Sequence, residues 1–107
     1  MAAESHDFAG LPVISISDEA LAEILLAGRE TNGVFSCNVR GEVWPARKYG
    51  RVRPEERTYL DFPALEEIVS LILGAWPSGG RFRVTSRGVA LVANDEPLFA
   101  FDRVFPP

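Results

Sequence analysis

The sequence predicts an α+β domain in which two helices pack on one face of an antiparallel sheet. Two stretches carry apolar residues at helical spacing, and several shorter ones alternate apolar and polar residues as half-buried strands do. Turn residues separate the strand-like stretches at hairpin spacing. Two topologies satisfy this order of elements: a ferredoxin-like βαββαβ arrangement with an extra C-terminal hairpin, or a duplicated helix-hairpin unit.

The N-terminal part of the chain predicts a tail followed by a short strand. Residues 1–10 are small or polar and are expected to form a flexible tail. The single domain then covers residues 11–107. Alternation over 11–17 indicates a strand, and Pro12 limits it to an edge or to a strand start.

A first amphipathic helix is expected over 20–30. Ser17 or Asp18 is the expected cap, because both side chains can accept a hydrogen bond from a free N–H of the first turn. Thr31-Asn32-Gly33 is expected to end the helix. The residues expected to face the core are Leu21, Ile24, Leu25 and Leu26.

A hairpin is expected over 34–46, with Arg40-Gly41 as its turn. Pro45 indicates that its second strand lies at an edge or bends. The side chains expected to face the core from the first strand are Phe35, Cys37 and Val39. Residues 47–57 show no sustained period and predict a long loop, and 58–60 predict a brief strand.

The clearest helix is predicted over 62–76, the most apolar long stretch of the chain. Pro63 suits a first helical turn, and Asp61 is the candidate cap. Pro77 and the two glycines that follow it are expected to end the helix. After it, alternation predicts a three-stranded meander with strands over 81–86, 89–93 and 98–101.

The two halves of the chain resemble each other in sequence. Ala-Leu-x-Glu-Ile occurs from Ala20 and again from Ala64, and each copy precedes a hairpin with Arg-Gly at its turn. Duplication explains the resemblance, and convergence of helix-hairpin units on common turn residues is the alternative. The matching hairpin positions, at identical spacing, are Gly33, Phe35, Arg40, Gly41 and Ala46 with Gly80, Phe82, Arg87, Gly88 and Ala93.

Composition excludes several classes of protein. With 107 residues and 47% hydrophobic residues, the chain predicts one ordinary globular domain. No apolar run reaches the ~20 residues of a membrane span, and the N-terminus lacks the pattern of a secretory signal. One cysteine excludes an internal disulfide. The sequence therefore predicts a cytoplasmic protein. Ten arginines against one lysine indicate either a GC-rich bacterial genome or selection for bidentate contacts with anions.

The sequence offers little for catalysis. His6, the only histidine, lies in the expected tail, so no Ser-His or Cys-His pair can be proposed. Cys37 is expected to face the core, where a free thiol behaves as a small hydrophobe. Asp61, Glu66 and Glu67 cluster at a helix start, where the helix dipole explains them without a metal. We therefore expect a protein that is not an enzyme, with no metal and no cofactor.

The most distinctive feature is the arginine-rich stretch 40–57, which carries six basic and three acidic residues beside two aromatic ones. Arginine beside aromatic residues suits protein interfaces and single-stranded nucleic acid. The alternative is a solvated loop whose Trp44 and Tyr49 dock on the core while its arginines pair with the acidic helices. Arginines of the 81–87 hairpin would extend this surface if the two hairpins are neighbours. The candidate binding residues are Arg40, Trp44, Arg47, Lys48, Tyr49, Arg51, Arg53, Arg57, Arg81, Arg83 and Arg87.

Three functions follow, in the order in which the sequence favours them. The first is a small bacterial accessory or regulatory protein that acts by protein–protein contact, with a partner or as a homodimer that covers the edge strand over 98–101. The second is binding of single-stranded nucleic acid through 40–57 and 81–87, although the net charge of −4 is far from that of a dedicated nucleic-acid binder. The third is a small anionic-ligand pocket, or an enzyme, beneath the 47–57 loop, using Arg47, Arg51 or Arg53.

Overall fold

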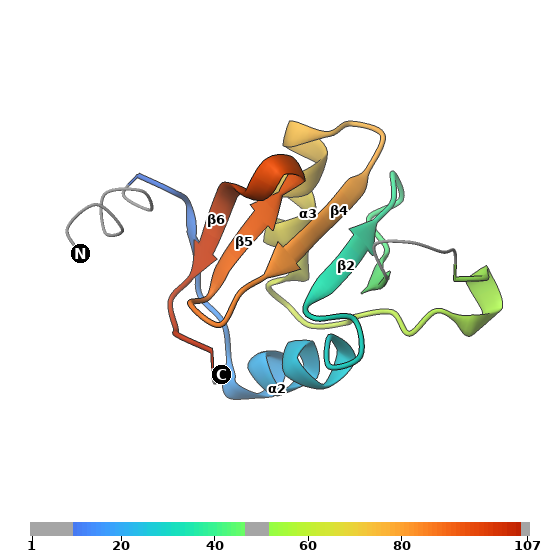
Figure 1. The fold of residues 1–107 in the computed structure, drawn as a ribbon, viewed down its shortest axis with the longest axis horizontal. Coiled ribbons are helices and arrows are strands. Elements are labelled where there is room, and N and C mark those ends of the chain that lie inside the picture. The colour runs from blue at the N-terminus through green and yellow to red at the C-terminus, as the bar shows by residue number, and fades with distance from the viewer. Residues whose placement is uncertain (1–9, 47–51, 106–107) are drawn as a thin grey trace.

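The computed structural model describes residues 10–46 and 52–105. Within these ranges the chain forms two α-helices and one six-stranded, mostly antiparallel mixed sheet, so the predicted α+β class is confirmed. Figure 1 shows α3 behind the sheet and α2 along its lower end. The elements are β1 (Val13–Ile14), α2 (Asp18–Ala27), β2 (Val34–Cys37), β3 (Val43–Pro45), α3 (Leu65–Ala75), β4 (Gly80–Val84), β5 (Val89–Val92) and β6 (Glu96–Phe101), with 3-10 turns at Pro54–Glu56 and Ala93–Asp95.

The strands lie in the order β1-β6-β5-β4-β2-β3. β1 runs parallel to β6, and every other neighbouring pair is antiparallel. A ferredoxin-like sheet would place the first strand inside the sheet, whereas β1 lies at one edge, so that alternative is wrong. The order instead contains the helix-hairpin unit twice, as α2-β2-β3 and α3-β4-β5, joined where β2 pairs with β4.

The two hairpins are related by a local two-fold axis between β2 and β4. Phe35 pairs with its sequence counterpart Phe82, so the axis passes between these two residues. On one side of the pair Cys37 is opposite Gly80, and on the other the N–H of Val84 donates to the carbonyl of Gly33 at 2.9 Å. These two flanking contacts are equivalent under the sequence match, so the repeat is one of geometry as well as of sequence.

The two hairpin turns also repeat each other. In the first turn the N–H of Asn38 donates to the carbonyl of Glu42 at 3.1 Å, and the N–H of Gly41 donates to the carbonyl of Asn38 at 3.0 Å. The second turn has both bonds at the equivalent positions, each at 2.9 Å. Gly41 and Gly88 have φ values of +82° and +76°, a backbone region in which glycine avoids the steric cost of a Cβ.

The core lies between the sheet and the two helices, and aromatic rings run through it. Ring centroids are 5.6 Å apart for Phe35–Phe82 and 6.2 Å for Phe82–Phe99. The row continues at 5.5 Å to Phe101 and at 5.4 Å to Phe105. Helix side chains complete the core, chiefly Ala20 and Ile24 from α2 and Ile68 and Ile72 from α3.

The first helix begins two residues before the predicted start, at Asp18, and also ends earlier than predicted. Ser17 is its cap, since the Ser17 hydroxyl accepts a hydrogen bond from the N–H of Ala20 at 3.1 Å. The helix ends at Gly28, before the predicted Thr31-Asn32-Gly33 stop. Leu26 was expected to face the core and is 71% exposed, because it lies off the stripe that contains Ile24.

The second helix is shorter at its N-terminus than the sequence predicts. It begins at Leu65 after a turn in which the N–H of Leu65 donates to the carbonyl of Phe62 at 3.0 Å. Pro63 therefore belongs to this turn. Asp61 is not the cap: the helix has no side-chain cap, and the N–H of Asp61 donates to the carboxylate of Glu23 at 2.7 Å.

Three strand predictions need correction. Val39 is 67% exposed, because β2 ends at Cys37 where the side chain of Asn38 accepts hydrogen bonds from the backbone of the turn. Residues 58–60 are not a strand, although the N–H of Leu60 donates to the carbonyl of Val43 at 2.8 Å. The strand predicted over 98–101 is β6, which lies inside the sheet between β5 and β1, and β1 pairs with its last two residues, Ala100 and Phe101.

Candidate functional site

The face of the sheet opposite the core carries a row of three side chains, one from each of three neighbouring strands. Phe35, Cys37 and Phe82 point into the core, so by alternation Ser36 and Arg81 point to the other face. Ser36 pairs with Arg81 of β4 on one side and with Trp44 of β3 on the other. Directly opposed residues of antiparallel strands have Cβ atoms about 4.5–5.5 Å apart, which brings the three side chains into one row.

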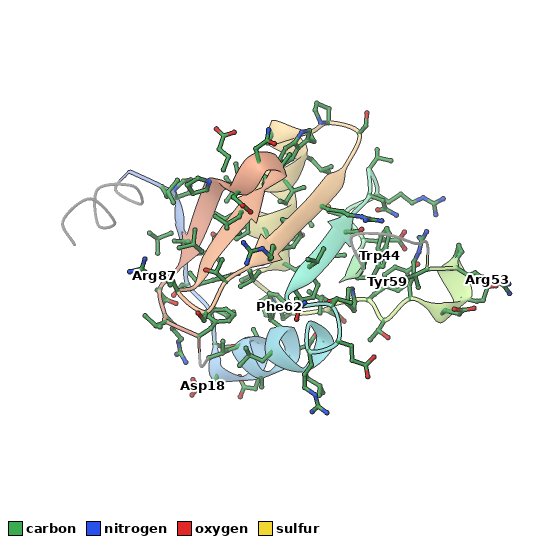
Figure 2. All side chains as sticks on the ribbon, in the orientation of Figure 1. Asp18, Trp44, Arg53, Tyr59, Phe62 and Arg87 are labelled. Carbon is green, nitrogen blue, oxygen red and sulfur yellow. The ribbon has the colours of Figure 1, made fainter. Side chains whose placement is uncertain are left out.

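Residues 52–60, here called the 52–60 segment, place a further arginine over this row. The guanidinium carbon of Arg57 lies 4.0 Å from the ring centroid of Trp44, and the Nε of Arg57 donates to the carbonyl of Val52 at 3.3 Å. Tyr59 contacts Trp44 edge-on, with centroids 6.0 Å apart. Figure 2 shows Trp44 beside Tyr59, with Arg53 farther out on the segment. Ring stacking and one backbone hydrogen bond thus hold the Arg57 side chain in place.

A cleft of about 480 Å³ opens between the row and the 52–60 segment, and we call it the arginine cleft. Its size is within the range of small-ligand sites, roughly 300–1,000 Å³. Three arginines and no acidic side chain belong to its described lining. Ser36, 9% exposed, adds a hydroxyl. The main lining residues are Ser36, Trp44, Val52, Arg53, Arg57 and Arg81.

This arrangement is suited to binding an anion. A guanidinium group presents N–H donors in a planar fork that matches a carboxylate or a phosphate. Arg53 forms an exposed ion pair with Glu56 at 3.8 Å, which an incoming anion would compete with at little cost because exposed pairs are weak.

The described lining of the arginine cleft includes no histidine, cysteine, aspartate or glutamate that could act as a general base. Cys37 points to the opposite face, into the core, and burial raises the pKa of its thiol. A raised pKa leaves less of the reactive thiolate at neutral pH. The described residues also include no group of three His, Cys, Asp or Glu side chains that could hold a metal ion.

The other predicted binding residues do not join the cleft. Arg40 and Arg87 occupy the turns of two hairpins whose central strands are antiparallel, so they lie at opposite ends of the sheet. Figure 2 shows Arg87 on the other side of the molecule from Arg53. Arg83 pairs with Asp95 at 3.3 Å. Arg47, Lys48, Tyr49 and Arg51 fall outside the described residues.

Trp44 differs from the open stacking platform that single-stranded nucleic acid requires. It is only 8% exposed, and Arg57 covers its ring. A base would have to stack on the outer side of Arg57, because aromatic platforms must be accessible to nucleobases. With Arg40 and Arg87 at opposite ends of the sheet, the described arginines do not form one continuous track along which a strand could lie.

Two features of the cleft could not be predicted from the sequence. Alternation places Ser36 on the correct face, yet nothing in the sequence marks it as the residue between Arg81 and Trp44. The stacking of Arg57 on Trp44 joins the last residue of the 47–57 loop to a strand residue that precedes the loop, and no local spacing indicates that contact.

Comparison of the chain with protein-family models, curated proteins and solved structures finds no match. Over the described parts of the chain, neither helix is long and apolar enough to cross a membrane.

Proposed function

We propose that this protein is a binding protein for an anionic ligand, which it holds in the arginine cleft through Arg57, Arg81 and Arg53. The observation that carries the proposal is the stack of Arg57 on Trp44. Long arginine side chains lose rotamer entropy when they bind, and a guanidinium already held by a ring and a carbonyl loses less. Binding, rather than turnover, fits the absence of a titratable base from the described lining.

The ligand class follows from the donors. Two or three guanidinium groups and the hydroxyl of Ser36 match a group with several acceptor oxygens, either a phosphate or a polycarboxylate. Such a site suits an accessory or regulatory protein that senses or carries an anion.

The test uses fluorescence of the cleft itself. The chain has two tryptophans, so a Trp76→Phe variant leaves Trp44 as the single reporter. Titration with inorganic phosphate and with citrate should change its emission in a saturable way. Arg57→Gln and Arg81→Gln should each weaken binding about tenfold, the scale of one charge-assisted hydrogen bond. Arg40→Gln, at a distant turn, should leave binding unchanged.

Several results would count against the proposal. The proposal would be contradicted if neither anion changed the emission of Trp44. It would also be contradicted if Arg40→Gln weakened anion binding as much as Arg57→Gln does. Tight binding of a single-stranded oligonucleotide that weakens steeply with salt, with no binding of either small anion, would favour the nucleic-acid alternative.

Protein–protein contact is a second candidate, supported by a groove of about 550 Å³ between α2 and the 52–60 segment. Leu26, 71% exposed, and Tyr59, 41% exposed, both line it. Exposed large apolar residues gathered in one groove are typical of interaction surfaces. A second copy of the chain is one candidate occupant.

Light scattering over a range of concentrations tests self-association. A dimer formed through the groove should dissociate in Leu26→Asp and persist in Val39→Asp, whose side chain is similarly exposed, 67%, at a hairpin turn. A strict monomer at high concentration, with no partner captured, would contradict protein–protein contact.

A further inference from the structure

The groove between α2 and the 52–60 segment, which we call the α2 groove, is a concave surface with a chemistry of its own. Its volume is about 550 Å³, and Figure 1 shows the segment passing close to the C-terminal end of α2. It shares only Val52 with the described lining of the arginine cleft. The anionic ligand proposed for the arginine cleft therefore does not account for the α2 groove.

Each wall of the α2 groove presents an apolar side chain to solvent. Leu26 on the α2 wall is 71% exposed, and Tyr59 on the segment wall is 41% exposed. Ala27 and Val52, both half-buried, also line the groove. Apolar surface gathered in one groove is stabilised when a partner covers it.

Carboxylates flank both of these apolar side chains. On the α2 wall, Glu23 and Glu30 line the groove on either side of Leu26 in the sequence. On the segment wall, Glu56 precedes Tyr59 by three residues. Acidic residues outnumber basic residues in the described lining by three to one. The arginine cleft has the opposite composition, so the two sites select ligands of opposite charge.

Two of the three carboxylates have partners within the chain, and both can still receive a cation. Glu23 accepts a hydrogen bond from the N–H of Asp61 at 2.7 Å, which holds its side chain and uses one of several acceptor positions of the carboxylate. Glu56 pairs with Arg53 at 3.8 Å. Because exposed pairs contribute little, a cation of a partner can replace Arg53 at little cost.

We propose that the α2 groove binds a basic segment of another protein, in which lysine or arginine residues flank an apolar residue. The apolar side chain lies between Leu26 and Tyr59, and the basic side chains reach the flanking carboxylates. Charge complementarity selects this partner, and docking of an amphipathic segment into a groove is a common mode of recognition. A second copy of the chain fits less well, because its net charge is −4.

Fluorescence anisotropy of a labelled peptide tests the proposal on the full chain. The probe is the peptide Lys-Leu-Ala-Lys-Leu-Ala-Lys, and the control peptide has glutamate in place of each lysine. The lysine peptide should bind in a saturable way, and its binding should weaken as salt rises because salt screens exposed charges. The glutamate peptide should not bind.

Substitution of the flanking carboxylates tests the charge complementarity. Glu30→Gln and Glu56→Gln should each weaken binding of the lysine peptide about threefold, the scale of one exposed ion pair. Glu19→Gln removes the same charge from α2 at an exposed position outside the groove, so it is the matched control and should leave binding unchanged.

Substitution of the exposed leucine tests the apolar contact. Leu26→Ala should weaken binding of the lysine peptide about fivefold, because it removes apolar surface that the peptide covers. Val39→Ala, at a similarly exposed residue of a hairpin turn, should leave binding unchanged. Both side chains are exposed, so the variants should fold, and circular dichroism checks that they do.

Three results would overturn the proposal. The first is no saturable binding of the lysine peptide. The second is equal weakening by Glu19→Gln and Glu56→Gln, or equal affinity of wild type and Leu26→Ala, since binding would then depend on overall charge alone. The third is a dimer that Leu26→Asp dissociates and the lysine peptide does not disrupt, which would assign the α2 groove to a second copy.

Discussion

Phe35 of β2 lies directly opposite Phe82 of β4, with the two rings stacked at a centroid distance of 5.6 Å and an interplanar angle of 25°. Each phenylalanine is the sequence counterpart of the other, so their contact lies on the local two-fold axis. Phe35 is fully buried and Phe82 is 3% exposed. The pair therefore joins the two helix-hairpin units at the centre of the one hydrophobic core.

The two phenylalanines should be energetically coupled. Phe35→Leu, Phe82→Leu and the double variant form a cycle in which we expect a coupling of about 0.5–1.5 kcal/mol, the usual worth of an aromatic pair beyond its buried area. Urea denaturation measures the free energies of unfolding. The same cycle for Phe35 and Phe105, which are separated by several rings of the aromatic row, should give less than about 0.5 kcal/mol. Equal coupling in both cycles would contradict a special contact on the axis.

The two equivalent turn glycines should differ in their tolerance of alanine. Gly41→Ala and Gly88→Ala both place a Cβ at positive φ, which costs roughly 1 kcal/mol. A Cβ at Gly41 would meet only a side-chain methyl of Val69, at 3.2 Å, whereas one at Gly88 would collide with the backbone carbonyl of Arg103. We therefore expect Gly88→Ala to be the more destabilising by at least about 1 kcal/mol in thermal or urea denaturation. Similar losses would show that the chain beyond β6 can move away.

The N-cap of α2 should contribute measurably to stability. Ser17→Ala removes the acceptor for the N–H of Ala20 and should cost about 1 kcal/mol, within the usual 0.5–2 kcal/mol of a lost cap. Ser17→Asp should restore most of the loss because aspartate is an equally good cap. Ser70→Ala on the exposed side of α3 is the control, expected to change the free energy of unfolding by less than about 0.5 kcal/mol.

Asp102 should make stability depend on pH at the end of β6. Its carboxylate accepts hydrogen bonds from the hydroxyl of Ser15 at 3.0 Å and from the N–H of Ile16 at 3.1 Å, and these bonds lower the pKa of Asp102. A lowered folded-state pKa stabilises the fold above the unfolded value of about 3.9, and this contribution is lost as pH falls through the folded pKa. The stability gap between wild type and Asp102→Ala should thus be present at pH 7 and shrink below about pH 4.

NMR titration of the Asp102 carboxyl checks this assignment directly. Ser15→Ala removes the bond with the largest effect and should move the pKa of Asp102 back toward its ordinary value. An ordinary pKa in the wild-type protein, or a stability gap that does not vary with pH, would show that the carboxylate is not held by these bonds.

Much of the local structure could be predicted because the spacing of apolar residues along the chain indicates which side chains are buried. The hairpin at Arg40-Gly41, the edge position of Pro45 and the cap at Ser17 all depend on a few neighbouring residues, and all are confirmed. Predictions failed where a side chain forms local hydrogen bonds that replace strand pairing. The side chain of Asn38 accepts a hydrogen bond within the turn, so β2 ends before Val39. The start of α3 was misjudged because the turn at Phe62 delays the helix past Pro63.

The sequence predicted which residues the candidate site contains but not which of them lie together. The sequence marks Trp44, Arg53, Arg57 and Arg81 as binding residues, and it also marks Arg40, Arg83 and Arg87, which the fold places elsewhere or pairs with Asp95. Nothing in the chain order separates these two groups. Which of them meet depends on strand neighbours and register, and both are properties of the whole sheet.

The sequence by itself determined the α+β class and most of the core residues, because hydrophobic period and turn chemistry act over a few residues. It left open the choice between a ferredoxin-like sheet and a duplicated helix-hairpin unit, which the strand order decided. Only the tertiary structure decided that β2 pairs with β4 through Phe35 and Phe82, that β6 lies inside the sheet, and that Arg57 stacks on Trp44. These contacts join residues far apart in the chain, and the free energy that selects them comes from burying both units in one core.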